Sequence, residues 1–170
     1  TAYEIYECDW SSDVCSSDLV VAYDRNATAP AARVWWTFRA FGHERISVLD
    51  GGWSKWLAEG RPISDRSAAR PSRSFTAKLR ATLVADLAAV RTASERNSAT
   101  LVDARTAGRF HGTEPEPRPG LRGGHVPNSR NLPFRTLLAE DGTLLPPPAL
   151  RHRFADAGVE TGKPTIALCG

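Results

Sequence analysis

The sequence lacks the features that mark membrane proteins, secreted proteins and metal-binding proteins. No apolar run approaches the roughly 20 residues that a helix needs to cross a bilayer, and no charged-then-apolar leader precedes a small-residue cleavage site. The three cysteines form no CxxC pair and no His/Cys cluster at zinc spacing, so we predict neither a disulfide framework nor a metal site, and no cofactor. The formal net charge of +3 comes from scattered arginines, which is too diffuse to indicate nucleic acid. We therefore expect a cytoplasmic protein without a membrane or nucleic-acid partner.

Methionine is also absent, and the first 19 residues do not resemble a protein segment. The run DWSSDVCSSDL at residues 9–19 back-translates without a mismatch to a common short-read sequencing adapter. Residues 1–5 fit the tail of the matching indexed primer, in the same frame and in the right order. We predict that residues 1–19 are a translated adapter, that Cys8 and Cys15 carry no meaning, and that the native chain begins near Val20.

The following stretch alternates short apolar runs with helical periodicity, which is typical of an α/β fold. Residues 20–23 and 46–49 are runs suited to buried parallel strands. Pro30 is suited to open the helix between them, and Gly42 to end it. Residues 50–52 (DGG) predict a tight turn into a second short helix. We do not interpret them as a phosphate-binding loop, because they lack the glycine repeat and the lysine of such a loop.

A second α/β pattern begins after a stretch rich in Ser, Arg, Ala and Pro. We interpret residues 20–63 as the C-terminal half of one domain, residues 64–81 as a linker, and residues 82–170 as the N-terminal part of a second domain. In the second domain we expect Thr82 to cap a helix, and residues 101–102 to form a strand. We also expect a long Pro/Gly loop at residues 114–124 and a helix that contains Leu150, Phe154 and Ala157. A last strand is expected at residues 165–168.

One cysteine follows the last strand directly. Strands of an open parallel sheet present chemistry at their carboxyl ends, where backbone N–H groups of the next turn favour an anion. A thiolate of Cys169 at such a place is a candidate nucleophile, with Gly170 as the first residue of its loop. From the residues alone, a buried structural cysteine is an equally good interpretation.

Five long sequence motifs occur between Val20 and Gly170: AARVWWTFRAFGH, SVLDGGWSKWLAEGRP, LVDARTAGRF, GTEPEPRPGLRGGHVPNSRNLPF and KPTIALCG. They resemble the two-domain rhodanese sulfurtransferases, in particular the 3-mercaptopyruvate type. The resemblance implies tandem rhodanese-like domains, each a parallel sheet with helices on both faces. It also implies a catalytically silent first domain and an active cysteine in the second.

The same resemblance implies a mechanism and a set of site residues. Cys169 takes a sulfur atom from 3-mercaptopyruvate, or from thiosulfate, and passes it as a persulfide to a thiol, to cyanide or to a thioredoxin-like acceptor protein. Arg109 and Arg118 match the arginines that hold the substrate's carboxylate and carbonyl. Gly170 favours the loop of the 3-mercaptopyruvate type over that of the thiosulfate type. We expect Asp103 with Arg105 to form a structural ion pair or turn cap, and His125 to be a hydrogen-bonded part of the loop scaffold.

Two other functions remain open at this point. A cysteine-dependent phosphatase of the same topology also places Cys at this strand end, within a C-x5-R loop, and a catalytically silent rhodanese-like binding module needs no nucleophile. The residue at the sixth position after Cys169 would separate the phosphatase from the sulfurtransferase. We further expect that both domains are incomplete in this sequence, and that a fragment of this extent is inactive and does not fold stably by itself.

Overall fold

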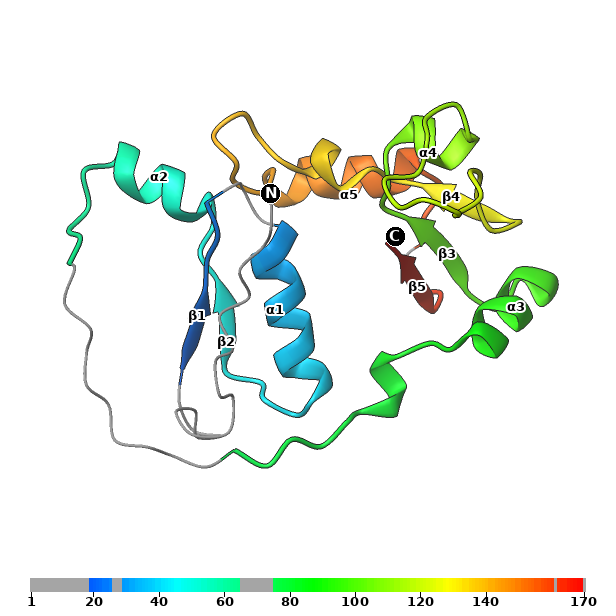
Figure 1. The fold of residues 1–170 in the computed structure, drawn as a ribbon, viewed down its shortest axis with the longest axis horizontal. Coiled ribbons are helices and arrows are strands. Elements are labelled where there is room, and N and C mark those ends of the chain that lie inside the picture. The colour runs from blue at the N-terminus through cyan, green and yellow to red at the C-terminus, as the bar shows by residue number, and fades with distance from the viewer. Residues whose placement is uncertain (1–18, 26–28, 65–74, 161, 170) are drawn as a thin grey trace. The chain divides into compact units, whose positions relative to one another are not determined.

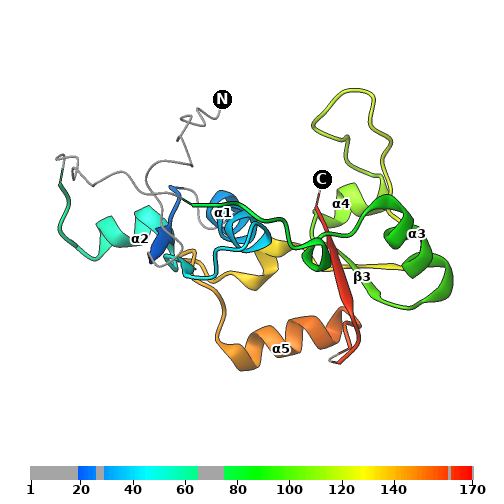
Figure 2. The same ribbon diagram turned by 90° about the horizontal axis from the view of Figure 1, so that it is seen from below.

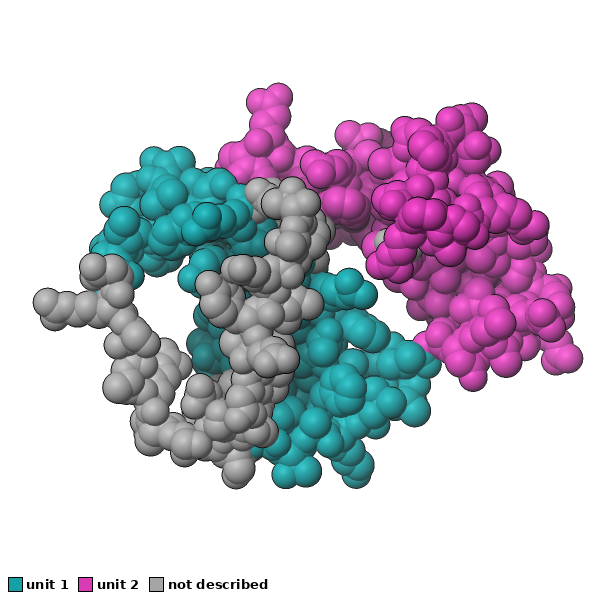
Figure 3. Space-filling model, viewed as in Figure 1, with its two compact units in different colours: residues 1–84 teal, residues 85–170 magenta. Residues whose placement is uncertain are grey.

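The computed structural model describes residues 19–25, 29–64, 75–160 and 162–169. It divides into two compact units, Thr1–Val84 and Ala85–Gly170 (Figure 3), which are described separately below. Of the predicted adapter-derived stretch, residues 1–18 lie outside the described residues, as does Gly170. The predicted boundaries of the domains and of the linker stay predictions.

Unit 1 contains two parallel strands that are connected through a helix (Figure 1). Strand β1 (Val20–Ala22) pairs with β2 (Ile46–Val48), and helix α1 (Ala29–Ala40) lies between them in the chain. Helix α2 (Gly52–Ala58) and a short 3-10 helix (Ala81–Leu83) follow. The apolar side of α1 packs on the strands through a cluster of buried residues, which comprises Ala22, Ala31, Phe38 and Ile46.

The predicted tight turn after β2 is present and requires glycine. Gly52 has a φ of +59°, and a Cβ at this position would lie 2.6 Å from the carbonyl oxygen of Asp24. The amide of Trp53 donates to that same oxygen at 2.8 Å, so the turn is held against the end of β1. A side chain at Gly52 would break this contact.

The described end of the predicted linker packs on unit 1. Lys78 N donates to the carbonyl of Phe41 at 3.0 Å, and Arg80 N donates to that of Ala40 at 2.7 Å. The Arg80 guanidinium also pairs with Glu44 at 2.7 Å. Residues 78–80 therefore continue along the end of α1 as part of a folded unit.

Unit 2 is a three-stranded parallel sheet in the order β4-β3-β5. Helices α3 and α5 lie on different sides of β5 (Figures 1 and 2), and the described sheets of both units are parallel, which confirms the predicted α/β class. The elements of this unit are α3 (Leu87–Arg96), β3 (Thr100–Asp103), α4 (Ala107–His111), β4 (Ser129–Asn131), a 3-10 helix (Phe134–Leu137), α5 (Pro147–Asp156) and β5 (Thr165–Leu168).

The prediction that Thr82 caps the first helix of this unit is wrong. Residues 81–83 form a 3-10 turn, and α3 begins only at Leu87. The N-cap is Asp86, whose carboxylate accepts a hydrogen bond from the amide of Ala89 at 2.8 Å. An aspartate in this position satisfies a free amide of the first turn and also interacts favourably with the helix dipole, so the helix starts there.

Strand β3 is the centre of unit 2. All four of its residues are buried, and Leu101 is 1% exposed. Leu101 forms a cluster with Ala93 and Ala99, against which Ile166 and Leu168 of β5 pack. The central strand β3 therefore packs against both α3 and β5, the strand that precedes Cys169.

We predict that Leu101→Ala destabilises the protein by about 2 to 5 kcal/mol, because it leaves a cavity in the cluster around β3. The matched control is Leu87→Ala in the same unit, since Leu87 is 78% exposed. The control is expected to change the free energy of unfolding by no more than about 0.5 kcal/mol. Urea denaturation of both variants measures the difference, and equal effects would contradict the described core.

Candidate active site

The carboxyl ends of three strands meet at one edge of the unit 2 sheet. Asp103, the last residue of β3, is in register with Asn131 of β4 and with Leu168 of β5. The amide of Ala104 donates to the carbonyl of Leu168 at 2.9 Å, which continues the pairing by one residue. Cys169 therefore follows β5 at this edge, in line with Ala104, and its thiol is free and exposed.

A short helix follows β3 at the same edge and carries Arg109. The Thr106 side chain caps α4 by accepting a hydrogen bond from the amide of Arg109 at 3.3 Å. Phe110 is buried beneath the helix. Arg109 thus lies in the middle of a five-residue helix that is fixed at its start by a cap and on its inner side by an aromatic ring.

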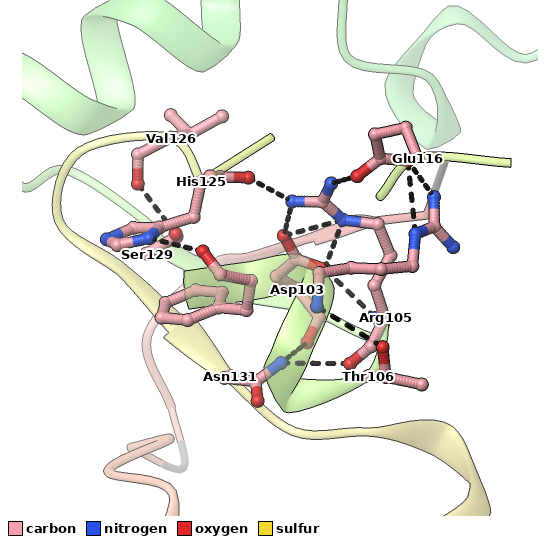
Figure 4. A network of polar contacts seen from close by, with 11 residues as sticks. Asp103, Arg105, Thr106, Glu116, His125, Val126, Ser129 and Asn131 are labelled. Carbon is pink, nitrogen blue, oxygen red and sulfur yellow. Dashed lines mark hydrogen bonds and ion pairs between the residues drawn. The ribbon is translucent and has the colours of Figure 1, made fainter. Parts of the chain in front are cut away.

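Asp103 and Arg105 form a tight structural pair, as the sequence predicted (Figure 4). The Asp103 side chain is 2% exposed and accepts from Arg105 Nη2 at 2.6 Å. Its carboxylate also accepts from the Arg105 amide at 2.9 Å and from Arg105 Nε at 3.0 Å. Arg105 Nη2 donates in addition to the carbonyl of Gly124 at 2.8 Å. Each nitrogen of the Arg105 guanidinium has a protein acceptor, since Nη1 donates to Glu116, so this residue serves the scaffold.

Glu116 bridges the two arginines of the site, and the sequence did not predict it. Its side chain is only 4% exposed. Oε1 accepts from Arg105 Nη1 at 2.7 Å, and Oε2 accepts from Arg109 Nη2 at 2.5 Å and from Arg109 Nε at 3.1 Å. Figure 4 shows the Glu116 carboxylate next to the Arg105 guanidinium. The predicted substrate arginine, Arg109, therefore has one edge of its guanidinium bound to the protein.

The arginines keep both carboxylates of this network ionised. Burial alone would raise the pKa of Asp103, but the hydrogen bonds and the positive charge of Arg105 outweigh it and lower that pKa below its ordinary value. The pKa of Glu116 is also lowered, chiefly by its hydrogen bonds to Arg109 and further by the charges of both arginines.

The long Pro/Gly loop is fastened at its base and exposed at its tip. Glu114 accepts from the Thr106 hydroxyl at 2.6 Å, and Gly124 N donates to the carbonyl of Arg109 at 3.3 Å. His125 bonds through Nδ1 to the carbonyl of Phe110 at 2.8 Å and stacks on its ring with a centroid separation of 3.8 Å. His125 is therefore part of the scaffold, as predicted.

The predicted site residues differ in how the protein holds them. Cys169 is exposed at the sheet edge, and Arg109 is partly buried on α4 with 19% of its side chain exposed. Arg118 lies on the exposed part of the loop and has no hydrogen-bond or ion-pair partner among the described residues. Within the described ranges, no group of three or more His, Cys, Asp or Glu side chains has a metal-binding arrangement. In the same ranges, no helix is long and apolar enough to span a membrane.

Asn131 completes the edge on the β4 side. Its side-chain amide donates to the carbonyls of Asp103 and Arg105, each at 3.0 Å. These bonds continue the connection between β3 and β4 after the register pairing ends. The backbone of the turn between β3 and α4 is thereby held on one side by Asn131 and on the other by Leu168, next to Cys169.

Comparisons with known proteins show which proteins this chain resembles. A family profile described as "Rhodanese-like domain" matches residues 6–59. The chain is 39% identical over 153 residues to 3-mercaptopyruvate sulfurtransferase of Homo sapiens, covering 89% of this chain and 52% of that protein. It is 41% identical over 162 residues to thiosulfate sulfurtransferase of Cricetulus griseus, covering 94% of this chain and 54% of that protein. The crystal structure of SseA from Escherichia coli, a 3-mercaptopyruvate sulfotransferase with the rhodanese fold, matches with a TM-score of 0.80 at 32% identity, over 93% of this chain and 58% of that one.

The chain spans about half the length of the curated relatives it matches. That ratio agrees with the predicted tandem arrangement of domains. The match to the family profile begins at residue 6, inside the stretch for which we predict an adapter origin. That origin stays a prediction.

The lowered carboxyl pKa values predict a loss of stability in acid. The ion pairs of Asp103 and Glu116 contribute fully above about pH 4, the ordinary pKa range of carboxyl groups, and this contribution disappears as the pH falls through the lowered values. Glu116→Gln removes one titrating group, so its free energy of unfolding should depend less on pH below about 4 than that of the wild type.

Urea denaturation of the wild type and of Glu116→Gln at a series of pH values measures this difference. Glu140→Gln is the control, because Glu140 is an exposed carboxylate of the same unit with no ion pair in the described part of the chain. The control should keep the pH dependence of the wild type. If the free energy of unfolding depended on pH in the same way for Glu116→Gln and the wild type, this would contradict the claim that Glu116 is ionised in the network.

Proposed function

The chain belongs to the rhodanese-like family, and from this premise we propose that the whole protein is a sulfurtransferase that uses 3-mercaptopyruvate, or alternatively thiosulfate, as its sulfur donor. The observation that carries the proposal is the exposed thiol of Cys169 at the carboxyl edge of a parallel sheet, where a helix with a partly buried arginine follows the neighbouring strand. An arginine on the helix that follows the neighbouring strand suits an anionic sulfur donor, since a guanidinium binds carboxylates through directed hydrogen bonds.

The proposed reaction passes through a persulfide on Cys169. The thiolate attacks the sulfur of 3-mercaptopyruvate, a sulfur–sulfur bond forms, and the carbon–sulfur bond breaks. The electron pair of that bond leaves with the carbon as the enolate of pyruvate, which takes up a proton. An acceptor thiolate or cyanide then attacks the outer sulfur and releases the Cys169 thiolate. No redox cofactor is needed for this balance.

The proposed roles of the arginines differ because the protein holds them differently. Arg109 is fixed on a capped helix and bound to Glu116, so it is suited to direct the donor's carboxylate. Arg118 is exposed on the loop without a partner in the described residues, and its charge remains available to an incoming anion. We propose that both contact the donor and that Gly170 belongs to the loop that surrounds the reacting sulfur.

The acceptor and the location in the cell are part of the same proposal. A low-molecular-weight thiol, cyanide or a thioredoxin-like protein is chemically able to take the outer sulfur of a persulfide. We propose a cytoplasmic location. The name of one relative, from Arabidopsis thaliana, describes that protein as mitochondrial.

We predict that Cys169→Ser in the whole protein abolishes sulfur transfer and leaves the fold intact. Serine packs like cysteine, but its hydroxyl has too high a pKa to act as the nucleophile. The release of pyruvate from 3-mercaptopyruvate in the presence of cyanide measures the activity. Ala167→Ser is the matched control, because it introduces a serine at an exposed position of the same strand, and it should retain activity. Turnover by Cys169→Ser would remove this residue from the mechanism.

We predict that Arg118→Ala lowers kcat/KM for 3-mercaptopyruvate by roughly 10- to 150-fold, the loss expected for a hydrogen bond to a charged group. Its effect on thiosulfate should be smaller, because a compact tetrahedral dianion needs fewer directed contacts than a carboxylate beside a carbonyl. Arg109→Ala should impair both donors, and Arg109→Lys should not restore activity, since a point charge does not reproduce the guanidinium fork.

Steady-state kinetics with both donors test these arginine variants. Arg122→Ala is the matched control, because Arg122 is exposed in the same loop and has no partner within the described ranges. It should behave like the wild type. If Arg118→Ala affected the two donors equally, or neither, the assignment of Arg109 and Arg118 as donor-binding residues would fail. The assignment of Cys169 as the nucleophile would not be affected.

A further inference from the structure

We propose that Glu116 is a positioning residue that binds one edge of the Arg109 guanidinium and thereby presents the other edge to the carboxylate of the donor. This inference rests on the proposed sulfurtransferase function and names a residue that the sequence did not single out. The geometry of the Arg105, Glu116 and Arg109 contacts carries it.

The first step concerns the donors of Arg109. A guanidinium has five N–H groups, of which Nε and one N–H of Nη2 point to one edge. Both nitrogens of this edge donate to Oε2 of Glu116, at 3.1 Å and 2.5 Å. Nη1 has no acceptor among the described residues, and Nη2 has a second N–H. These remaining donors suit the two oxygens of a carboxylate.

The second step concerns what holds Glu116 itself. Its other oxygen accepts from Arg105 Nη1 at 2.7 Å. The Arg105 side chain is 14% exposed and is bound in turn to Asp103 at the end of β3 and to the carbonyl of Gly124. Figure 4 shows this series of contacts from Asp103 at the strand end through Arg105 to Glu116. Because each member is held by the next, Glu116 is not free to turn with an incoming donor, and the direction of Arg109 is set before the donor binds.

The third step is the charge of the cluster. Asp103 and Glu116 carry two negative charges, and Arg105 and Arg109 carry two positive charges, so the four residues together are neutral. Arg109 therefore orients the carboxylate of the donor more than it adds to the net electrostatic attraction for it. Attraction for an anion falls to Arg118, which lies two residues after Glu116 in the same loop and is exposed. The bonds of Glu116 thus fix one arginine directly and anchor the loop that carries the other.

A purely structural role of Glu116 makes a different prediction. If Glu116 only held the loop in place, its loss would lower stability and reduce kcat, because less of the protein would be folded, and KM would stay at the wild-type value. If it positions Arg109, its loss raises KM for 3-mercaptopyruvate and changes kcat much less. The split between KM and kcat distinguishes the two roles.

The variant for the test is Glu116→Gln, with Glu114→Gln as the matched control. Both residues are glutamates of the same loop, but Glu114 accepts from the Thr106 hydroxyl and not from an arginine. In the whole protein, Glu116→Gln should raise KM for 3-mercaptopyruvate by roughly tenfold or more, the loss typical of one hydrogen bond to a charged group. Its kcat should stay within about threefold of the wild-type value. Glu114→Gln should match the wild type in both constants.

A second variant covers the case in which Glu116→Gln does not fold. Glu116→Asp keeps the charge but withdraws the carboxylate by one methylene, so it should also raise KM for 3-mercaptopyruvate. A folded Glu116→Asp or Glu116→Gln with the wild-type KM would overturn the proposal. A lowered kcat with an unchanged KM would also overturn it, in favour of the structural role.

Pyruvate binding provides a readout that does not depend on turnover. Pyruvate carries the same carboxylate and carbonyl as the donor, and the Nε–H resonance of Arg109 in the NMR spectrum reports the bond to Glu116. Saturable perturbation of this resonance by pyruvate is expected in the wild type and should be weakened about tenfold in Glu116→Gln. If the wild type bound pyruvate in this way but transferred no sulfur, the proposed function would fail and the positioning role would stand. Equal pyruvate binding by both proteins would reject the positioning role.

Discussion

The parallel pairing of β3 with both of its neighbours is the constraint on which the candidate site depends. Because the three strands run in the same direction, Asp103, Asn131 and Leu168 end at one edge of the sheet. The residue that follows each strand lies just after the last paired residue of that strand, and Cys169 takes this position after Leu168. The burial of Leu101 and its packing against β5 hold the register, so the position of the thiol depends on the core of unit 2.

Charge pairing at this edge makes the burial of four ionised groups possible. An unpaired carboxylate as buried as Asp103 or Glu116 would be strongly destabilising, and the two arginines remove that cost through direct hydrogen bonds. The same contacts lower the pKa values of the Asp103 and Glu116 carboxyl groups. Among the described residues the pairing leaves Arg118 outside the network, which is the reason why we propose different roles for Arg109 and Arg118.

Much of the fold was predictable from the sequence, because apolar runs and glycine turns have local causes. Residues 20–23 and 165–168 contain the strands β1 and β5, and the Asp103–Arg105 pair was also expected. Strand β4 was missed, since Ser-Arg-Asn has no apolar alternation and is a strand only because β3 pairs with it. Glu116 was missed for a similar reason. A glutamate in a Pro/Gly loop has the sequence signature of a solvated residue, and only the tertiary contacts with Arg105 and Arg109 bury it.

The most direct test of the central claim is the mass of the Cys169-containing peptide after the whole protein has reacted with 3-mercaptopyruvate without an acceptor. The account predicts that this peptide gains one sulfur atom, that one equivalent of pyruvate is released, and that cyanide then removes the added sulfur as thiocyanate. A peptide of unchanged mass, or an added sulfur on another residue, would contradict the assignment of Cys169 as the sulfur carrier.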